Sequence, residues 1–344
     1  MTRIRGPRMS KYKAEVIGPL LHHRSMGGGT SCFLLGAKGC GKTTGLLNFA
    51  ERVAYTNQRT GEIRPETVIW RGRDIDYWNR IAPDRRVIWV HAPDVDELRW
   101  TTNYQDWFVP EGVRVYEDVR DLVEQIQAWD PEGLVHVVYG PSGIYEMTPE
   151  WRGTVSIQRA ELLKALAHHD LDIDCLFWFE LLFGLTRIAR PDWFCSLVGD
   201  EIQRLFPQAP RGLRYVLQSY VLAETMPDFR KTNKSMYLAS HATMTIDYRL
   251  YPLIQTWGYM RGARTRPGSS VYKKVPSTMD PGAVIFDGGL FASMVFDPSP
   301  GLPLVIVKRP LRTLPVVITR KGKTGSRGSE PEYLGGIPVP VGGG

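Results

Sequence analysis

The sequence has few cysteines and no cluster of histidines spaced like metal ligands. There are only 4 cysteines among 344 residues, and no two of them are spaced as in a Cys-x-x-Cys motif. The histidine pairs His22-His23 and His168-His169 have no cysteine or carboxylate neighbours at ligand spacing. We therefore expect neither structural disulfides nor a zinc site, and the pattern fits a reducing compartment.

Long apolar segments are also missing. No apolar run approaches the ~20 residues that a membrane span needs. The stretch from Met1 to Lys13 is basic but lacks the apolar core of a signal peptide. The sequence predicts a cytoplasmic protein without a membrane span, located in the host cytoplasm if the chain is viral.

Charge is plentiful but unevenly placed. The formal net charge is +7, with arginine and lysine crowded into residues 3–13 and 308–327, whereas acidic residues predominate between Asp94 and Glu132. Such segregation suits a polyanionic partner, with nucleic acid as the leading candidate. Solvated basic tails are the alternative explanation.

One complete phosphate-binding motif, G-x-x-x-x-G-K-[ST], spans residues 36–43. An apolar run at residues 32–35 precedes it and predicts a buried strand. Apolar residues at helical spacing follow it, from Leu46 to Ala54. Strand, glycine-rich loop and helix in this order are the context that the motif requires. The chain is therefore expected to bind ATP or GTP.

The chemistry of the motif assigns roles to its residues. Glycines let backbone N–H groups surround the β-phosphate at the start of a helix. Lys42 would reach the β- and γ-phosphates, and Thr43 would hold Mg²⁺. The predicted nucleotide-binding residues are Gly36, Ala37, Lys38, Gly39, Cys40, Gly41, Lys42, Thr43 and Thr44.

Alternating apolar runs and helical patterns predict an α/β fold, a P-loop NTPase (RecA-like) with a mainly parallel sheet and helices on both faces. The expected strands are residues 32–35, 67–70, 87–90, 113–116, 134–139, 175–179, 236–240, 283–286 and 304–307. The expected helices are residues 46–54, 76–81, 119–126 (capped by Asp118), 162–166, 194–205 and 213–221.

Composition divides the chain into four parts. We expect a basic N-terminal arm at 1–29, a P-loop ATPase domain at 30–260, and a small β-containing C-terminal extension at 261–320. A basic loop, residues 262–270, opens the extension. The glycine- and proline-rich tail at 321–344 is predicted to be disordered.

Ligands of parallel sheets lie at the carboxyl ends of the strands, so polar residues after buried strands are candidates for catalysis. Glu180 follows the predicted strand 175–179 and could organise Mg²⁺ or orient the attacking water. Asp94 is the competing acid, but it lies three residues beyond its strand and past a proline. His241 follows the strand 236–240 and could contact the γ-phosphate.

Hydrolysis is faster when a guanidinium group neutralises charge on the γ-phosphate. Arg230 precedes the strand 236–240 and Arg249 follows it. The sequence does not rank these two arginines.

The segment from Phe229 to Asp247, FRKTNKSMYLASHATMTID, resembles a segment of the HerA/FtsK superfamily of P-loop motors. In that superfamily an Arg-Lys pair leads into a strand that ends in a polar sensor, usually Gln. The phosphate loop, an acid after an apolar strand and this segment occur here in the same order, over residues 31–260. Viral assembly and packaging ATPases, including Zot-like proteins, and HerA-type DNA translocases are closest in size.

The resemblance implies that Lys42, Thr43, Glu180 and His241 carry the nucleotide chemistry. It also implies an arginine acting in trans within a ring, as in a hexamer, around DNA, with viral structural or replication proteins as further partners. Two positions depart from the superfamily pattern. Phe179 stands where an aspartate usually precedes the glutamate, and His241 replaces Gln.

Three hypotheses follow. The first is an ATP-hydrolysing motor that translocates or packages DNA, most simply double-stranded, and is virus- or plasmid-encoded. The second is an ATP-binding assembly or morphogenesis factor that acts on protein partners, because only one acid is found at Glu180. The third is a P-loop phosphotransferase, which the fold alone permits.

Overall fold

The structure is a computed structural model. It describes residues 29–55, 66–81, 83–102, 107–129, 134–143, 145–168, 171–288, 292–297 and 304–310. The expected N-terminal arm up to residue 28 and the expected tail lie outside the described residues. So do the basic residues beyond 310. None of the helices in the described ranges combines the length and apolar character needed to cross a bilayer.

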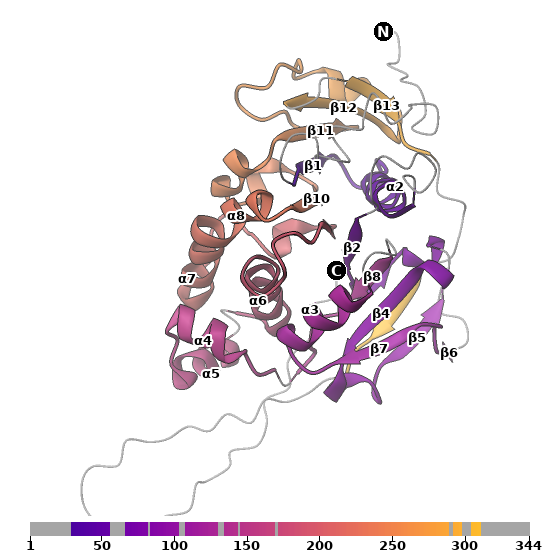
Figure 1. Ribbon diagram of the computed structural model, residues 1–344. Helices are drawn as coiled ribbons and strands as arrows, with labels where there is room; N and C mark the ends of the chain where they lie inside the picture. The colour runs from indigo at the N-terminus through magenta and orange to yellow at the C-terminus, as the bar shows by residue number, and fades with distance from the viewer. Residues whose placement is uncertain are drawn as a thin grey trace, which may run out of the picture.

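Ten strands of the described chain form one sheet, in the order β13-β12-β11-β1-β10-β9-β2-β8-β4-β7 (Figure 1). Every neighbouring pair from β11 to β7 is parallel, whereas β12 and β13 are added antiparallel. The predicted α/β class with a mainly parallel sheet is confirmed. The strands are β1 (Ser31–Leu35), β2 (Thr67–Arg71), β4 (Arg86–His91), β7 (Val113–Tyr116), β8 (Val135–Val138), β9 (Cys195–Gly199), β10 (Lys234–Ser240), β11 (Thr256–Met260), β12 (Ala283–Gly288) and β13 (Ala292–Val295).

The two faces of the sheet bury different cores because side chains alternate along each strand. In β1, Cys32 and Leu34 share a core with the apolar face of α2 (Lys42–Tyr55). Phe33 and Leu35 belong to the core on the opposite face. The helices that contribute to this second core are α3 (Val119–Ala128), α4 (Pro149–Val155), α5 (Arg159–Ala167), α6 (Ile173–Arg187), α7 (Gly212–Tyr220) and α8 (Met226–Lys231).

A smaller antiparallel sheet lies on the α2 side. Its strands, in order, are β3 (Ile75–Asp76), β14 (Val305–Lys308), β5 (Arg99–Thr102) and β6 (Trp107–Phe108). Val305 and Val307 join Trp78 and Trp100 in the same core as α2. The C-terminal strands therefore extend both sheets: β12 and β13 the large one, and β14 the small one.

Several short helices connect these elements. Seven are 3₁₀ helices within the described ranges: η4 (Trp78–Arg80), η5 (Pro83–Arg85), η6 (Ala92–Asp94), η7 (Ile202–Arg204), η9 (Thr243–Thr245), η10 (Tyr248–Leu253) and η11 (Val275–Thr278). A π-helical turn, η8 (Val221–Thr225), joins α7 to α8. The predicted cap of α3 is confirmed, since the Asp118 side chain accepts a hydrogen bond from the backbone N–H of Asp121.

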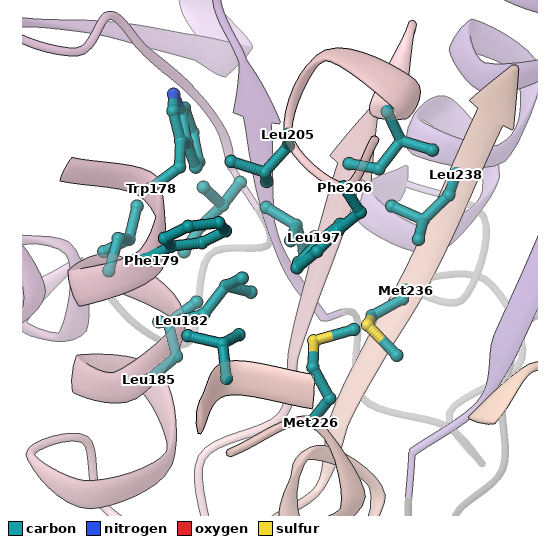
Figure 2. Close-up of a cluster of buried hydrophobic side chains, with 14 of the residues drawn as sticks. Trp178, Phe179, Leu182, Leu185, Leu197, Leu205, Phe206, Met226, Met236 and Leu238 are labelled. Carbon is teal, nitrogen blue, oxygen red and sulfur yellow. The ribbon is translucent and has the colours of Figure 1, made fainter. Parts of the chain in front are cut away.

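The strand predicted at residues 175–179 is wrong, because this segment lies inside α6. The apolar run continues to Arg187, and a helix of 15 residues buries it on all sides. Asp172 caps the helix by accepting a hydrogen bond from the backbone N–H of Cys175. Phe179 points towards Leu197 of β9 and the ring of Phe206, whose centroid is 5.6 Å from its own (Figure 2). Glu180 therefore sits in mid-helix, and the prediction that it ends a strand is wrong.

The helix predicted at residues 194–205 is also wrong. Residues Cys195–Gly199 form β9, a fully buried strand between β2 and β10. A strand covered on both faces is apolar at nearly every position, so the period of two that marks an exposed strand is lost. Leu197 packs in one core and Val198 in the other. The sequence also did not lead us to predict β11.

Glu180 is fully buried among apolar side chains. Tyr145 Oη donates a hydrogen bond to its Oε2 at 2.5 Å, and the backbone N–H of Thr148 donates to its Oε1 at 2.7 Å. Burial raises the pKa of Glu180 to about 7, although these two hydrogen bonds favour the charged form. The carboxyl group links α6 to the segment before α4 and is part of the core.

We predict that Glu180→Gln stabilises the protein increasingly as the pH rises. A raised carboxyl pKa gives stability that is complete below the unfolded value of about 4.3 and is lost as the pH rises through about 7. Relative to the parent, the free energy of unfolding of the variant should therefore rise by about 1–3 kcal/mol between about pH 5 and pH 8. Urea unfolding at both pH values measures this, and a pH-independent difference would contradict the assigned pKa.

Candidate active site

The phosphate loop joins β1 to α2 in the conformation that its glycines allow. Gly39 and Gly41 have φ angles of 75° and 99°, which other residues rarely adopt. Lys42 is only 5% exposed. Its Nζ donates hydrogen bonds to the carbonyl oxygens of Gly36 at 2.9 Å and Ala37 at 3.0 Å. The ammonium group thus lies within the loop rather than in solvent.

The rest of the predicted nucleotide-binding segment surrounds this lysine. Ala37, Lys38 and Gly39 form the exposed tip of the loop, whereas Cys40 is buried. Burial also raises the pKa of the Cys40 thiol, against the opposing effect of Lys42. Thr44 is half-buried in the first turn of α2. The loop therefore presents backbone and a helix N-terminus, as anion binding requires.

Asp200 is the acid that meets the phosphate loop. It follows β9 directly, and Thr43 Oγ1 donates a hydrogen bond to Asp200 Oδ2 at 2.5 Å. Glu180 was predicted for this place, but its carboxylate contacts Tyr145 and Thr148 instead. The catalytic and metal-binding roles predicted for Glu180 depended on a strand that ends at residue 179. Residues 173–187 form α6 instead, so the structural reason for those roles is gone.

Glu201, the next residue, has an unusual backbone conformation and a side chain that lies between two cations. Its φ and ψ angles of 48° and 46° are left-handed, which costs free energy for a residue with a side chain. Its Oε2 forms ion pairs with Arg73 at 2.5 Å and Arg204 at 3.0 Å. Two adjacent acids, Asp200 and Glu201, thus stand at the end of β9 with separate partners.

His241 lies between the lysine and the acid pair. It follows β10, which is inserted between β1 and β9. Its Nδ1 is 3.1 Å from Lys42 Nζ, and its Nε2 is 3.7 Å from Glu201 Oε1. Because an ammonium group only donates, Nδ1 is the acceptor in its contact with Lys42, and the opposite ring nitrogen, Nε2, faces Glu201. Lys42 and His241, both predicted as site residues, are therefore brought together.

The C-terminal part of the chain braces the phosphate loop. The backbone N–H of Ala37 donates to the carbonyl of Arg261 at 2.9 Å, and the N–H of Gly282 donates to the carbonyl of Cys40 at 2.8 Å. Gly262 approaches so closely that a Cβ there would lie 2.7 Å from Ala37 Cβ. The segment between β11 and β12 is thus fixed to the loop at both ends.

The two predicted arginines lie in different surroundings. Arg230 is exposed in the last turn of α8, before β10, so it lies at the amino edge of the sheet, opposite the phosphate loop. Arg249 Nη2 forms an ion pair with Asp247 Oδ2 at 2.6 Å, and its Nη1 donates to Ser219. The action of either arginine in trans stays a prediction. Asp94 is buried and accepts a hydrogen bond from the N–H of Ser142.

The oxygen atoms at the end of β9 suit a magnesium ion carried by a nucleotide. The Thr43 hydroxyl and Asp200 carboxylate are hard oxygen donors, which Mg²⁺ prefers, and it normally keeps waters and phosphate oxygens as its other ligands. In the part of the chain that the structure describes, no cluster of three or more His, Cys, Asp or Glu could hold a metal by itself. The residues present therefore fit Mg²⁺ that arrives with a nucleotide.

Sequence reasoning missed Asp200, Glu201, Arg73 and Arg204. One signal could have found the acid pair, since Leu197-Val198-Gly199 is a short apolar run that ends in glycine and two adjacent acids. The length of the apolar run 173–187 could also have excluded a strand there. The two arginines carry no local signal, because tertiary contacts alone bring them to Glu201.

No protein-family model and no curated protein sequence matches this chain. Among solved structures, it is similar to the genome packaging NTPase B204 from Sulfolobus turreted icosahedral virus 2 in complex with sulfate. The identity is 10% and the TM-score 0.40, over 78% of this chain and 96% of that chain.

Two further similar structures are the DNA-packaging ATPase B204 from Sulfolobus turreted icosahedral virus and the N-terminal domain of zonular occludens toxin from Neisseria meningitidis. The first is 11% identical, with a TM-score of 0.36 over 79% of this chain and 99% of that chain. The second is 10% identical, with a TM-score of 0.29 over 70% and 81%. These are distant likenesses, and the function of this chain has to follow from its own side chains.

We predict that Arg249→Ala destabilises the protein by about 1–3 kcal/mol, because it leaves the buried Asp247 without its ion-pair partner. Burial acts to raise the pKa of Asp247, but hydrogen bonds from Arg249 and Gln218 outweigh it and lower the pKa. Arg230→Ala, an exposed matched control, should change stability by less than about 0.5 kcal/mol. Urea unfolding at neutral pH measures both, and equal effects would contradict an anchoring role for Arg249.

Proposed function

We propose that this chain binds Mg²⁺-ATP at the phosphate loop and hydrolyses it. The hydrogen bond of 2.5 Å between Thr43 and Asp200 carries this proposal, because it joins the loop to the acid pair after β9. Lys42 and His241 complete the arrangement at the same edge of the sheet. Bound Mg²⁺ would be held by Thr43 and Asp200 and would neutralise charge on the phosphates.

The acid pair divides two roles between its members. Asp200 is engaged with Thr43, so it suits the metal side of the nucleotide. Glu201 suits the general base: it would accept a proton from the water that attacks the γ-phosphate, while the bond to the β-phosphate oxygen breaks. Its ion pairs with Arg73 and Arg204 would first have to loosen. His241 links Lys42 to Glu201 and would sense whether the γ-phosphate is present.

The assembly-factor hypothesis was based on a single acid at Glu180. The adjacent acids Asp200 and Glu201 remove that argument for it. They also remove one of the two departures from the HerA/FtsK pattern, since Asp200 and Glu201 supply the usual Asp-Glu pair. His241 remains the other departure. The hydrolysis hypothesis is therefore better supported by the described residues than it was by the sequence.

We propose further that hydrolysis drives the movement of DNA, as in translocation or packaging. The support is the order of phosphate loop, acid pair and sensor segment, together with the net charge of +7 and the basic residues near both ends of the sequence. The similar B204 and zonular occludens toxin structures agree with this proposal but do not carry it. A ring in which an arginine acts in trans on the neighbouring site belongs to the same proposal.

The nucleotide roles predict three distinct phenotypes. Lys42→Ala should weaken ATP binding about tenfold or more, because it removes charge-assisted hydrogen bonds to the phosphates. Glu201→Gln should bind ATP normally but lower the hydrolysis rate about 10²- to 10⁴-fold, as expected for a general base. Asp200→Asn should lose turnover and the Mg²⁺ dependence of binding. Calorimetric titration and a phosphate-release assay measure these effects.

Glu180→Gln is the control for these variants and should retain ATP turnover. If Glu180→Gln stays folded and loses turnover while Glu201→Gln keeps it, the assignment of the acids is wrong. Tight ATP binding by the parent without turnover under any condition would favour the ATP-binding assembly factor instead.

The motor proposal predicts that DNA stimulates ATP turnover by the parent several-fold and that this stimulation falls steeply with salt, because phosphate contacts release counterions. Phosphate release with single-stranded DNA, double-stranded DNA and no DNA measures it. Turnover that is equal in all three conditions would contradict coupling to DNA.

A further inference from the structure

The loops that follow β10 and β11 carry exposed positive charge beside the nucleotide site. Residues 241–282 contain six arginines and lysines and only two acids. Of these acids, Asp247 is buried against Arg249, and Asp280 is half-buried. Arg261, Arg264, Lys273 and Lys274 are exposed, and among the described residues none of them has a carboxylate within ion-pair distance.

The same loops also carry large side chains that are mostly exposed to solvent. Tyr248 is 69% exposed, Tyr272 is 67% exposed and Met244 is 64% exposed. Arg264 Nη1 lies 3.5 Å from Met244 Sδ, which joins the loop after β11 to the loop after β10. The guanidinium group of Arg249, next to Tyr248, lies 5.4 Å from the ring of Tyr215 on α7.

The loop after β11 folds back on itself, so its basic residues gather in one region. The backbone N–H of Gly262 donates to the carbonyl of Pro276 at 3.0 Å, and the N–H of Val275 donates to the carbonyl of Tyr272. These contacts bring the segment 272–274 towards Arg261 and Arg264. We call the combined region, made of Met244, Tyr248, Arg261, Arg264, Tyr272, Lys273 and Lys274, the loop surface; it lies on the connections after β10 and after β11 (Figure 1).

We propose that the loop surface binds a single-stranded nucleic acid. Arginine and lysine side chains without acidic partners among the described residues match the negative charge of a phosphodiester backbone. Tyrosine rings that face solvent offer stacking platforms to unpaired bases, whereas a duplex keeps the faces of its bases covered. The single strand is therefore the occupant that uses both kinds of side chain.

The position of the loop surface links it to the nucleotide. Both ends of the segment 261–282 are hydrogen-bonded to the phosphate loop, through Ala37 and Cys40. A nucleic-acid strand bound to this segment would therefore act on the backbone of the phosphate loop. By linkage, a bound nucleotide would change the affinity of the protein for the nucleic-acid strand. This coupling rests on the proposed ATPase function, whereas strand binding itself does not.

The test is fluorescence anisotropy with a labelled deoxythymidine strand of about 20 nucleotides and a duplex of equal length. The triple variant Arg264→Ala/Lys273→Ala/Lys274→Ala should bind the strand at least about tenfold more weakly and lower the salt slope by about two, since each lost phosphate contact removes about 0.7. Tyr248→Ala/Tyr272→Ala should weaken strand binding about tenfold without changing the salt slope.

The matched control is Arg99→Ala/Arg114→Ala/Lys164→Ala, which removes the same number of exposed charges from other parts of the surface. It should bind the strand like the parent. Equal affinities of the two triple variants, or a parent that binds the duplex as tightly as the strand, would overturn the proposal. So would a triple variant whose only change is a smaller assembly in light scattering, which would make the loop surface an interface between copies.

ATP turnover without nucleic acid separates this proposal from the proposed function. The loop-surface triple variant should keep the parent's basal turnover, because its residues lie outside the nucleotide contacts. A parent that binds the strand but never hydrolyses ATP contradicts the proposed function and leaves the loop surface supported. A parent that hydrolyses ATP while the loop-surface variant binds the strand normally contradicts only the loop surface.

Discussion

The backbone pairing of β1, β10 and β9 is the constraint on which the site depends. Leu35 pairs with Ser240, and Leu238 pairs with Gly199, so three parallel strands end at the same edge of the sheet. The residues that follow them are the phosphate loop, His241 and the Asp200-Glu201 pair. A different strand order would separate Lys42 from His241 and Thr43 from Asp200, although each local segment could remain unchanged.

Charged side chains surround the acid pair at the end of β9. Glu201 combines a left-handed backbone with two guanidinium partners, and His241 connects it to Lys42. Strain at such a residue persists only when neighbouring contacts stabilise it. Here those contacts include the ion pairs with Arg73 and Arg204 and the hydrogen bond from the Glu201 N–H to Asp200 Oδ1.

The C-terminal strands matter more to the site than their composition indicates. β12 and β13 widen the main sheet, and the segment that leads into β12 holds the phosphate loop at Ala37 and Cys40. The sequence marked residues 262–270 only as a basic loop. Their closeness to the phosphate loop follows from the pairing of β11 with β1, which no local pattern records. This pairing places the loop surface beside the phosphate loop.

The sequence by itself determined the phosphate loop, the α/β class and the position of His241, because these depend on short motifs and on apolar runs bounded by polar residues. It misplaced the acid: the run before Glu180 and the run before Asp200 are both apolar, and burial on every side removes the periodicity that separates helix from strand. Only the tertiary structure decided between them. Length and capping favour a helix at 173–187, and the gap between β2 and β10 is filled by 195–199. Contacts between distant segments, such as those of Arg73 and Arg204 with Glu201, were likewise decided by folding, since they depend on strand order and not on local sequence.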